Sequence, residues 1–134
     1  AKEMERTFLM IKPDAVKKNL IGEILKRTED AGFEILGLKM DKLSPTKAKE
    51  FYCVHKGKTF YQKLVKFISS GNVVGVLLTR RNAVKKLREF VGATNPKEAK
   101  EGTIRRDFAT NVTRNAVHAS DSAGSFRYES KFFF

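Results

Sequence analysis

The chain has 134 residues, of which 41% are hydrophobic and 31% charged, and it carries a formal charge of +12. This length suits a single domain over residues 1–134, and the apolar content excludes a disordered chain. No apolar run approaches the ~20 residues of a membrane helix and no apolar signal core opens the chain, so we expect a cytoplasmic protein with no membrane partner. The single cysteine, Cys53, excludes a disulfide framework and a zinc site built from several cysteines. The excess of basic residues favours anionic partners.

The first part of the chain predicts a strand, a helix and a second strand. Residues 7–11 form a β-type run that ends at a proline, which cannot continue a hydrogen-bonded ladder. Apolar residues at helical spacing predict a helix over 21–28. Alternation predicts a strand over 33–43, with one face that carries Phe33, Ile35 and Gly37.

The middle of the chain predicts three helices and the most apolar strand. A Ser-Pro pair opens a helix over 44–52, because serine caps a helix and proline fits its first turn. Residues 60–68 repeat apolar side chains at helical spacing. The continuous apolar run 73–78 is typical of a central, buried strand. An asparagine at residue 82 can cap the next helix, which Gly92 ends.

The remainder predicts a loop, a strand and a helix. Residues 93–114 hold few apolar side chains and predict a long loop, a feature that is usually functional in a compact domain. A short strand is expected at 116–119 and a helix from about residue 122. The order of elements indicates an α+β sandwich with helices on one face of a small sheet.

His118, Ser120 and Glu129 are the candidates for chemistry. His118 and Ser120 share a face if 116–119 is a strand. Glu129 lies at helical spacing among phenylalanines, where a carboxylate needs a partner. That partner is either a lysine or arginine, or an imidazole that the carboxylate orients, and spacing does not decide between them. The other histidine, His55, is interpreted as an ordinary histidine.

Three basic residues lie at notable positions: Lys12 ends the first strand, Arg88 lies beside the apolar stripe of its helix, and Arg105 lies in the long loop. Each of them taken alone is interpreted as an ordinary solvated charge. Arginine matches phosphate oxygens with two parallel hydrogen bonds. Convergence of these cations on a histidine would form a polyphosphate site.

Several segments together resemble the nucleoside diphosphate kinase family over residues 5–134. The three most specific are Ile11-Lys12-Pro13-Asp14, Gly102-Thr-Ile-Arg105 and Asn115-Ala-Val-His118-Ala-Ser120-Asp121-Ser122. The resemblance implies a ferredoxin-like sandwich with a four-stranded antiparallel sheet and covering helices. It also implies transfer of the γ-phosphate of a nucleoside triphosphate, mainly ATP, to a nucleoside diphosphate. The route would be ping-pong, through a phosphohistidine.

The resemblance also implies a role for each matching residue. His118 would be the nucleophile, and Glu129 and Ser120 would hold its ring. Lys12 and Tyr52 would contact the transferred phosphate. The rest of the nucleotide would be bound by Arg88, Thr94 and Arg105 at the polyphosphate, by Asn115 with Lys12 at the ribose, and by Phe60 and Val112 at the base. Mg²⁺ would be carried by the phosphates without a protein ligand, and Asp121 is a candidate contact through water.

Relatives of this kind assemble from dimers into tetramers or hexamers, so a homo-oligomer is expected. The last three residues, 132–134, are phenylalanines, and we expect them to be buried against the core or a neighbouring subunit. Two alternatives remain at this point. One is a basic nucleic-acid-binding module, although the aromatic signature of RNA-binding sheets is missing; nonspecific electrostatic binding would weaken with salt. The other is an inactive member of the same family.

Overall fold

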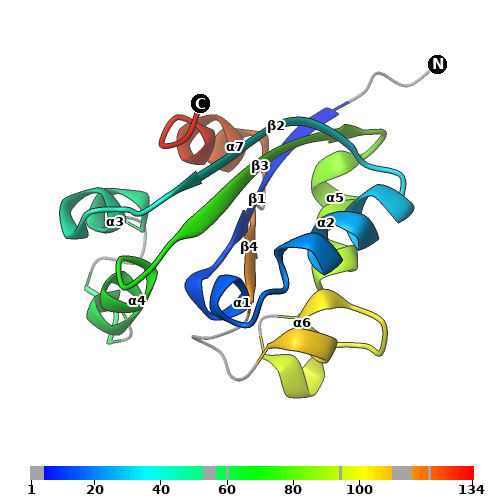
Figure 1. Ribbon diagram of the computed structural model, residues 1–134. Coiled ribbons are helices and arrows are strands. Elements are labelled where there is room, and N and C mark those ends of the chain that lie inside the picture. The colour runs from blue at the N-terminus through cyan, green and yellow to red at the C-terminus, as the bar shows by residue number, and fades with distance from the viewer. Residues whose placement is uncertain (1–4, 53–56, 60, 94, 110–115, 121) are drawn as a thin grey trace.

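The computed structural model describes residues 5–52, 57–59, 61–93, 95–109, 116–120 and 122–134. Its centre is an antiparallel sheet of four strands in the order β2-β3-β1-β4 (Figure 1). The strands are β1 (Glu5–Ile11), β2 (Glu34–Asp41), β3 (Val73–Arg80) and β4 (Val117–Ala119). The four-stranded antiparallel sheet and the central position of β3 are therefore confirmed. Within the described ranges, no helix has the length and apolar content needed to cross a membrane.

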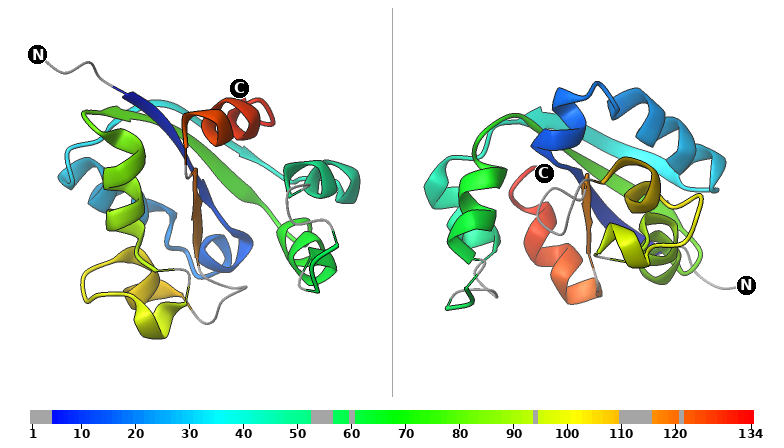
Figure 2. Two further views of the ribbon diagram at one scale, coloured as in Figure 1. Left: turned by 180° about the vertical axis from the view of Figure 1, so that it is seen from behind. Right: turned by 90° about the horizontal axis from the view of Figure 1, so that it is seen from below.

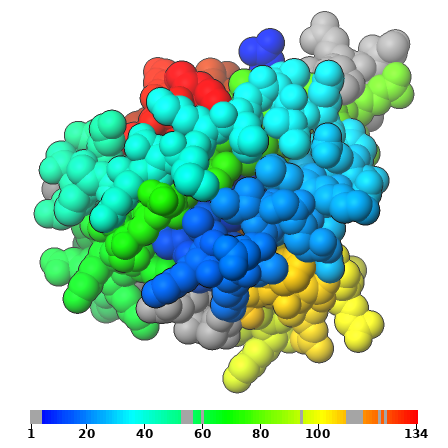
Figure 3. Space-filling view, in the orientation of Figure 1, coloured from blue at the N-terminus to red at the C-terminus, as the bar shows by residue number. Residues whose placement is uncertain are grey.

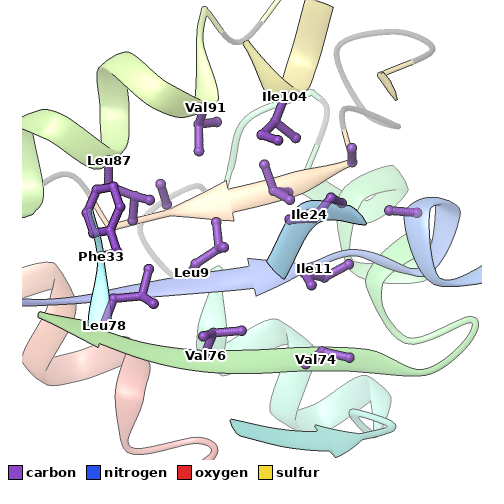
Figure 4. Close-up of a cluster of buried hydrophobic side chains, with 14 of the residues drawn as sticks. Leu9, Ile11, Ile24, Phe33, Val74, Val76, Leu78, Leu87, Val91 and Ile104 are labelled. Carbon is purple, nitrogen blue, oxygen red and sulfur yellow. The ribbon is translucent and has the colours of Figure 1, made fainter. Parts of the chain in front are cut away.

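One face of the sheet is covered by the helices α1 (Pro13–Lys17), α2 (Ile21–Asp30), α5 (Ala83–Val91) and α6 (Ile104–Phe108). We call it the aliphatic face, since its sheet residues are Leu9, Ile11, Val74, Val76 and Leu78. Helix side chains such as those of Ile24, Leu87, Val91 and Ile104 close over these residues (Figure 4).

The opposite face is covered by α7 (Ala123–Ser130) and by the paired helices α3 (Pro45–Phe51) and α4 (Tyr61–Ile68). We call it the aromatic face, because its core contains Phe8, Phe51, Tyr52 and Phe133. In Figure 2, α7 and α2 lie on opposite sides of the sheet. The expectation of helices on one face is therefore wrong. Both sides of β1 are apolar, so each side needs a cover.

The strand β2 departs from simple alternation. Ile35 pairs with Leu78, whereas Gly37 pairs with Leu77, so a bulge lies between them. Leu77 and Leu78 point to opposite faces, and therefore Ile35 and Gly37 do as well. A Cβ atom on Gly37 would lie 3.0 Å from the ring of Phe134, on the aromatic face. The predicted shared face of Phe33, Ile35 and Gly37 is thus wrong at Gly37, since a bulge inserts one extra residue.

Other boundaries differ from the sequence pattern in small ways. The predicted loop over 93–114 contains α6 and a 3₁₀ turn, η2 (Pro96–Glu98), and α1 lies in the predicted turn after β1. Ser44 caps α3 as expected, by accepting from the backbone N–H of Lys47. Asn82 precedes α5 in a left-handed conformation, and its side chain makes no cap hydrogen bond.

The C-terminal phenylalanines are buried to different degrees. Phe133 is 4% exposed and its ring lies over Gly75, where an added Cβ would be 2.6 Å away. Phe132 is partly buried in the same cluster, whereas Phe134 is 49% exposed. Burial against the core is confirmed for Phe133; Phe134 is not buried within this chain, and burial of it against a neighbouring subunit stays a prediction. Glycine at residue 75 is required because no side chain fits beneath the ring.

Candidate active site

The short strand β4 places His118 on the aromatic face. His118 pairs with Met10 of β1, so its side chain leaves the sheet on the same side as Met10. There the rings of Phe51 and Tyr52 present their edges to the imidazole, at centroid distances of 5.3 and 6.0 Å. The side chain of His118 is 20% exposed, so it reaches solvent while two aromatic rings limit its rotation.

Glu129 of α7 contacts both His118 and Ser120, the two residues that strand alternation predicted to share a face. Its Oε1 accepts a 2.6 Å hydrogen bond from the Ser120 hydroxyl. Its Oε2 lies 3.0 Å from Nε2 of His118, a close contact between the carboxylate and the imidazole. In the described part of the chain the carboxylate thus has an imidazole and a hydroxyl as partners, rather than a lysine or arginine. With Nε2 facing the carboxylate, Nδ1 is the nitrogen left for other chemistry.

Lys12 and Arg105 are buried cations, each 4% exposed. Burial first, and then repulsion by Arg105, lower the pKa of Lys12 from 10.5 to about 7, while Asp14 opposes the shift. The guanidinium of Arg105 donates to the carbonyls of Gly92 at 3.1 Å and Val117 at 3.0 Å. These bonds anchor it beside β4.

The pKa of Arg105 is also lowered, to about 10, by burial and then by repulsion from the exposed Arg88. Lys12, Arg88 and Arg105 therefore form a chain of cations in which each repels the next. A polyanion bound among them would remove that repulsion, so the arrangement favours a polyphosphate.

Tyr52 follows α3 and is 3% exposed. Burial, and next the negative charge of Glu129, raise the pKa of its phenol. The hydroxyl therefore stays protonated and can donate to an anion beside the imidazole.

The structure brings together six of the predicted site residues, namely Lys12, Tyr52, Arg105, His118, Ser120 and Glu129, and links Arg88 to them electrostatically. The predicted residues Phe60, Thr94, Val112, Asn115 and Asp121, and also His55, lie outside the described residues. Sequence reasoning missed Phe51, whose ring is nearer His118 than that of Tyr52. The sequence marks Phe51 only by its place beside Tyr52. An apolar residue in a helix gives the same sequence pattern whether its side chain packs against the core or against a histidine.

The described residues hold no group of three or more His, Cys, Asp or Glu side chains that could bind a metal ion. The carboxylate of Glu129 is occupied by Ser120 and His118. A metal ion that enters this site with a bound ligand would be held by oxygens of that ligand.

A half-buried imidazole that faces a carboxylate through one nitrogen, near buried cations on a ferredoxin-like sheet, is an arrangement that favours a phosphotransferase. The family model described as nucleoside diphosphate kinase matches residues 5–134. The nucleoside diphosphate kinase of Nitrosococcus oceani is 53% identical over 98% of this chain and 92% of its own, and that of Persephonella marina is 47% identical over 98% and 94%.

Solved structures agree with this match. The Aquifex aeolicus nucleoside diphosphate kinase superposes with a TM-score of 0.95 at 45% identity, covering 98% of this chain and 96% of its own. The halophilic enzyme from Halobacterium salinarum, in complex with CDP, gives 0.94 at 37% identity, with 98% and 88% covered. The chain belongs to the nucleoside diphosphate kinase family, and it is an enzyme of the phosphotransferase class.

Proposed function

We propose that this chain, as a single domain, transfers the γ-phosphate of a nucleoside triphosphate, mainly ATP, to a nucleoside diphosphate through a phosphohistidine at His118. The observation that carries the proposal is the contact of Nε2 with Glu129 at 3.0 Å, which leaves Nδ1 for attack. We place the reaction in the cytoplasm, where nucleoside triphosphates are abundant.

In the first half-reaction, Nδ1 of His118 attacks the γ-phosphorus. An N–P bond forms, the bond from the γ-phosphorus to the bridging oxygen breaks, and the nucleoside diphosphate leaves with the electron pair of that bond. The ring then carries positive charge, which the carboxylate of Glu129 stabilises. In the second half-reaction a terminal phosphate oxygen of another diphosphate attacks the same phosphorus, and the N–P bond breaks. The result is ping-pong exchange.

The cations and Tyr52 supply charge stabilisation, which phosphoryl transfer needs more than acid–base catalysis. We assign Lys12 and the Tyr52 hydroxyl to the transferred phosphate and Arg88 and Arg105 to the other phosphates. The remaining assignments rest on the family motifs alone: Thr94 at the phosphates, Asn115 at the ribose, and Phe60 and Val112 at the base. The CDP complex of the Halobacterium salinarum relative supports a nucleoside diphosphate as ligand.

The expected cofactor is Mg²⁺, held by phosphate oxygens, with Asp121 as its candidate contact through water. Bound there, the ion would neutralise part of the phosphate charge. The roles assigned above to side chains are separate from this effect of the ion.

The test is incubation of the purified protein with γ-labelled ATP and Mg²⁺, followed by removal of the nucleotide. We expect acid-labile label on the protein that transfers to added GDP, and no label on His118→Ala. A folded wild-type protein without label would overturn the proposal and favour the nucleic-acid-binding alternative.

We further propose that a second copy of this chain pairs with the edge strand β2. β2 has one neighbour, β3, in the described sheet, and it carries Leu36, Leu38 and Met40 at 44, 53 and 52% exposure. Figure 3 shows β2, in cyan, open along the surface. Antiparallel pairing of two identical edge strands is self-complementary under a twofold axis, and such a dimer can build a tetramer or hexamer.

Sedimentation tests this second proposal. We expect dimers or multiples of dimers for the wild type, and monomers for Leu38→Glu, because a charge at the strand edge blocks pairing. Lys47→Glu, an exposed change on α3, is the control and should keep the assembly. A wild-type monomer would contradict the proposal.

A further inference from the structure

The residue directly before β4 has an unusual backbone. Ala116 is fully buried and has φ of +72°, in the left-handed region. A side chain disfavours this conformation, which glycine adopts without strain. The next residue, Val117, begins the three-residue strand that carries His118. The position of the nucleophile therefore depends on a bend that alanine would not adopt by itself.

Both peptide groups of Ala116 are held by the segment that ends β1. Its carbonyl accepts from the backbone N–H of Lys12 at 2.8 Å. Its N–H donates to Oδ2 of Asp14 at 3.0 Å, across 102 residues of chain. The side chain of Asp14 is therefore the one part of this clamp that a substitution can remove.

Asp14 lies at a site where a carboxylate is costly. The residue is 6% exposed, and its Oδ1 has no hydrogen-bond partner among the described residues. A buried carboxylate that is only partly hydrogen-bonded opposes folding. Its position, between the backbone of Ala116 and the charge of Lys12, suggests a role in the site rather than in the core.

We propose that Asp14 is a positioning residue that holds Ala116 in the left-handed conformation and thereby sets His118 against Lys12. The inference rests on the proposed phosphohistidine function and extends it to a residue that contacts neither the phosphate nor the imidazole. Asp14 links the two segments that carry the nucleophile and the lysine, so their relative placement depends on it.

A competing explanation is purely electrostatic. Asp14 raises the pKa of Lys12 against the larger effects of burial and Arg105, so on this explanation its charge favours the protonated lysine. The two explanations differ for Asp14→Asn, because the amide oxygen can still accept from the Ala116 N–H while the charge is lost. They differ again when Ala116 is replaced by glycine, which needs no brace at positive φ.

The experiment measures the single-turnover rate of protein phosphorylation from ATP, at saturating ATP and as a function of its concentration. For Asp14→Ala we expect a roughly 100-fold lower saturating rate, the effect of a nucleophile displaced by about 1 Å. The concentration for half-maximal rate should change less than about threefold, because the arginines are untouched. In the Ala116→Gly background, Asp14→Ala should lower the saturating rate only about tenfold.

Asp30→Ala is the matched control, since Asp30 is exposed and pairs only with Lys26 in the described structure; its rate should equal that of the wild type. Hydrogen exchange gives a readout independent of activity: the amide of Ala116 should lose its protection in Asp14→Ala and keep it in Asp14→Asn. Circular dichroism confirms that each variant is folded.

The outcomes separate the two proposals. An unlabelled wild type would overturn the phosphohistidine function. A labelled wild type with an unaffected Asp14→Ala would overturn the positioning role alone. Equal losses of phosphorylation rate in Asp14→Asn and Asp14→Ala, without rescue by Ala116→Gly, would also overturn the positioning role and would support the electrostatic explanation. If Asp14→Ala does not fold, Asp14→Asn decides between the positioning and the electrostatic explanation, through its phosphorylation rate and the exchange protection of the Ala116 amide.

Discussion

On one side of the sheet the buried sheet side chains are aliphatic, from Leu9 to Leu78, and they pack on apolar side chains of α1, α2, α5 and α6. On the other side they are aromatic, and among them lie His118, Tyr52 and Glu129, each with a polar partner or a perturbed pKa. Lys12, which follows β1, is a buried cation that Arg105 of α6 repels. The comparison indicates a division of labour, in which the aliphatic face stabilises the fold and the aromatic face uses part of that stability to bury charge.

The variant with the largest expected effect on this division is Lys12→Met. Removing the cation from the transferred phosphate should lower the rate roughly 1000-fold, about 4 kcal/mol in the activation barrier. The same change should raise the melting temperature by about 3 °C, because a buried charge is replaced by an apolar side chain. Enzyme assays and thermal unfolding at pH 6 measure both effects.

The direction in which pH changes the stability of the protein follows from the pKa of Lys12. The folded pKa of Lys12, about 7, lies below its ordinary value of 10.5, so the unfolded chain binds more protons between these values and the contribution of Lys12 to stability rises with pH there. The stability advantage of Lys12→Met should therefore be largest below pH 7 and vanish near pH 10.5. Lys17→Met, at an exposed residue, is the control. A destabilised Lys12→Met at pH 6 would contradict the division.

The second test compares one residue from each face. Leu78→Ala on the aliphatic face should lower the free energy of unfolding by about 3 kcal/mol, through lost burial and a cavity. Its rate per folded molecule should stay within about twofold of the wild type. Phe51→Leu on the aromatic face should cost less stability yet lower the rate about tenfold, because the ring beside His118 is lost. Denaturant unfolding and the single-turnover rate check the pair, and an equal loss of rate in both would remove the distinction.

Glu129→Gln tests whether the carboxylate acts on the imidazole or only fills space. We expect a rate roughly 30-fold lower, about 2 kcal/mol, since the charge that stabilises the developing imidazolium is lost while the shape is kept. Glu34→Gln, an exposed change on β2, should have no effect. A wild-type rate for Glu129→Gln would show that Ser120 and the aromatic rings orient His118 without help.

The last prediction concerns the pH dependence of kcat/KM. Lys12 loses its proton near pH 7, so kcat/KM for ATP should fall by up to about tenfold per pH unit above that value. Lys12→Arg should lack the alkaline decrease, since arginine stays charged. The same decrease in Lys12→Arg would assign it to another group.

Much of the site was predictable from sequence because its residues lie in recognisable local segments. The strand, cap and helix patterns placed His118 and Ser120 on one face, and helical spacing placed Glu129 among apolar residues. The partner of Glu129 was not predictable, since a lysine and an imidazole satisfy a carboxylate equally well until the chain is folded. Phe51 and Asp14 were missed for the same reason: their significance lies in contacts with residues far along the chain.

The amino-acid sequence by itself determined where most strands and helices form, because a period of 2 or 3.6 residues and a capping serine act over a few neighbours. Only the tertiary structure decided that both faces of the sheet are covered, that Gly37 turns away from Ile35, and that Ala116 bends against Asp14. It also decided the pKa of Lys12. Register, burial and the loss of water around a charge arise from long-range packing, which no local pattern encodes.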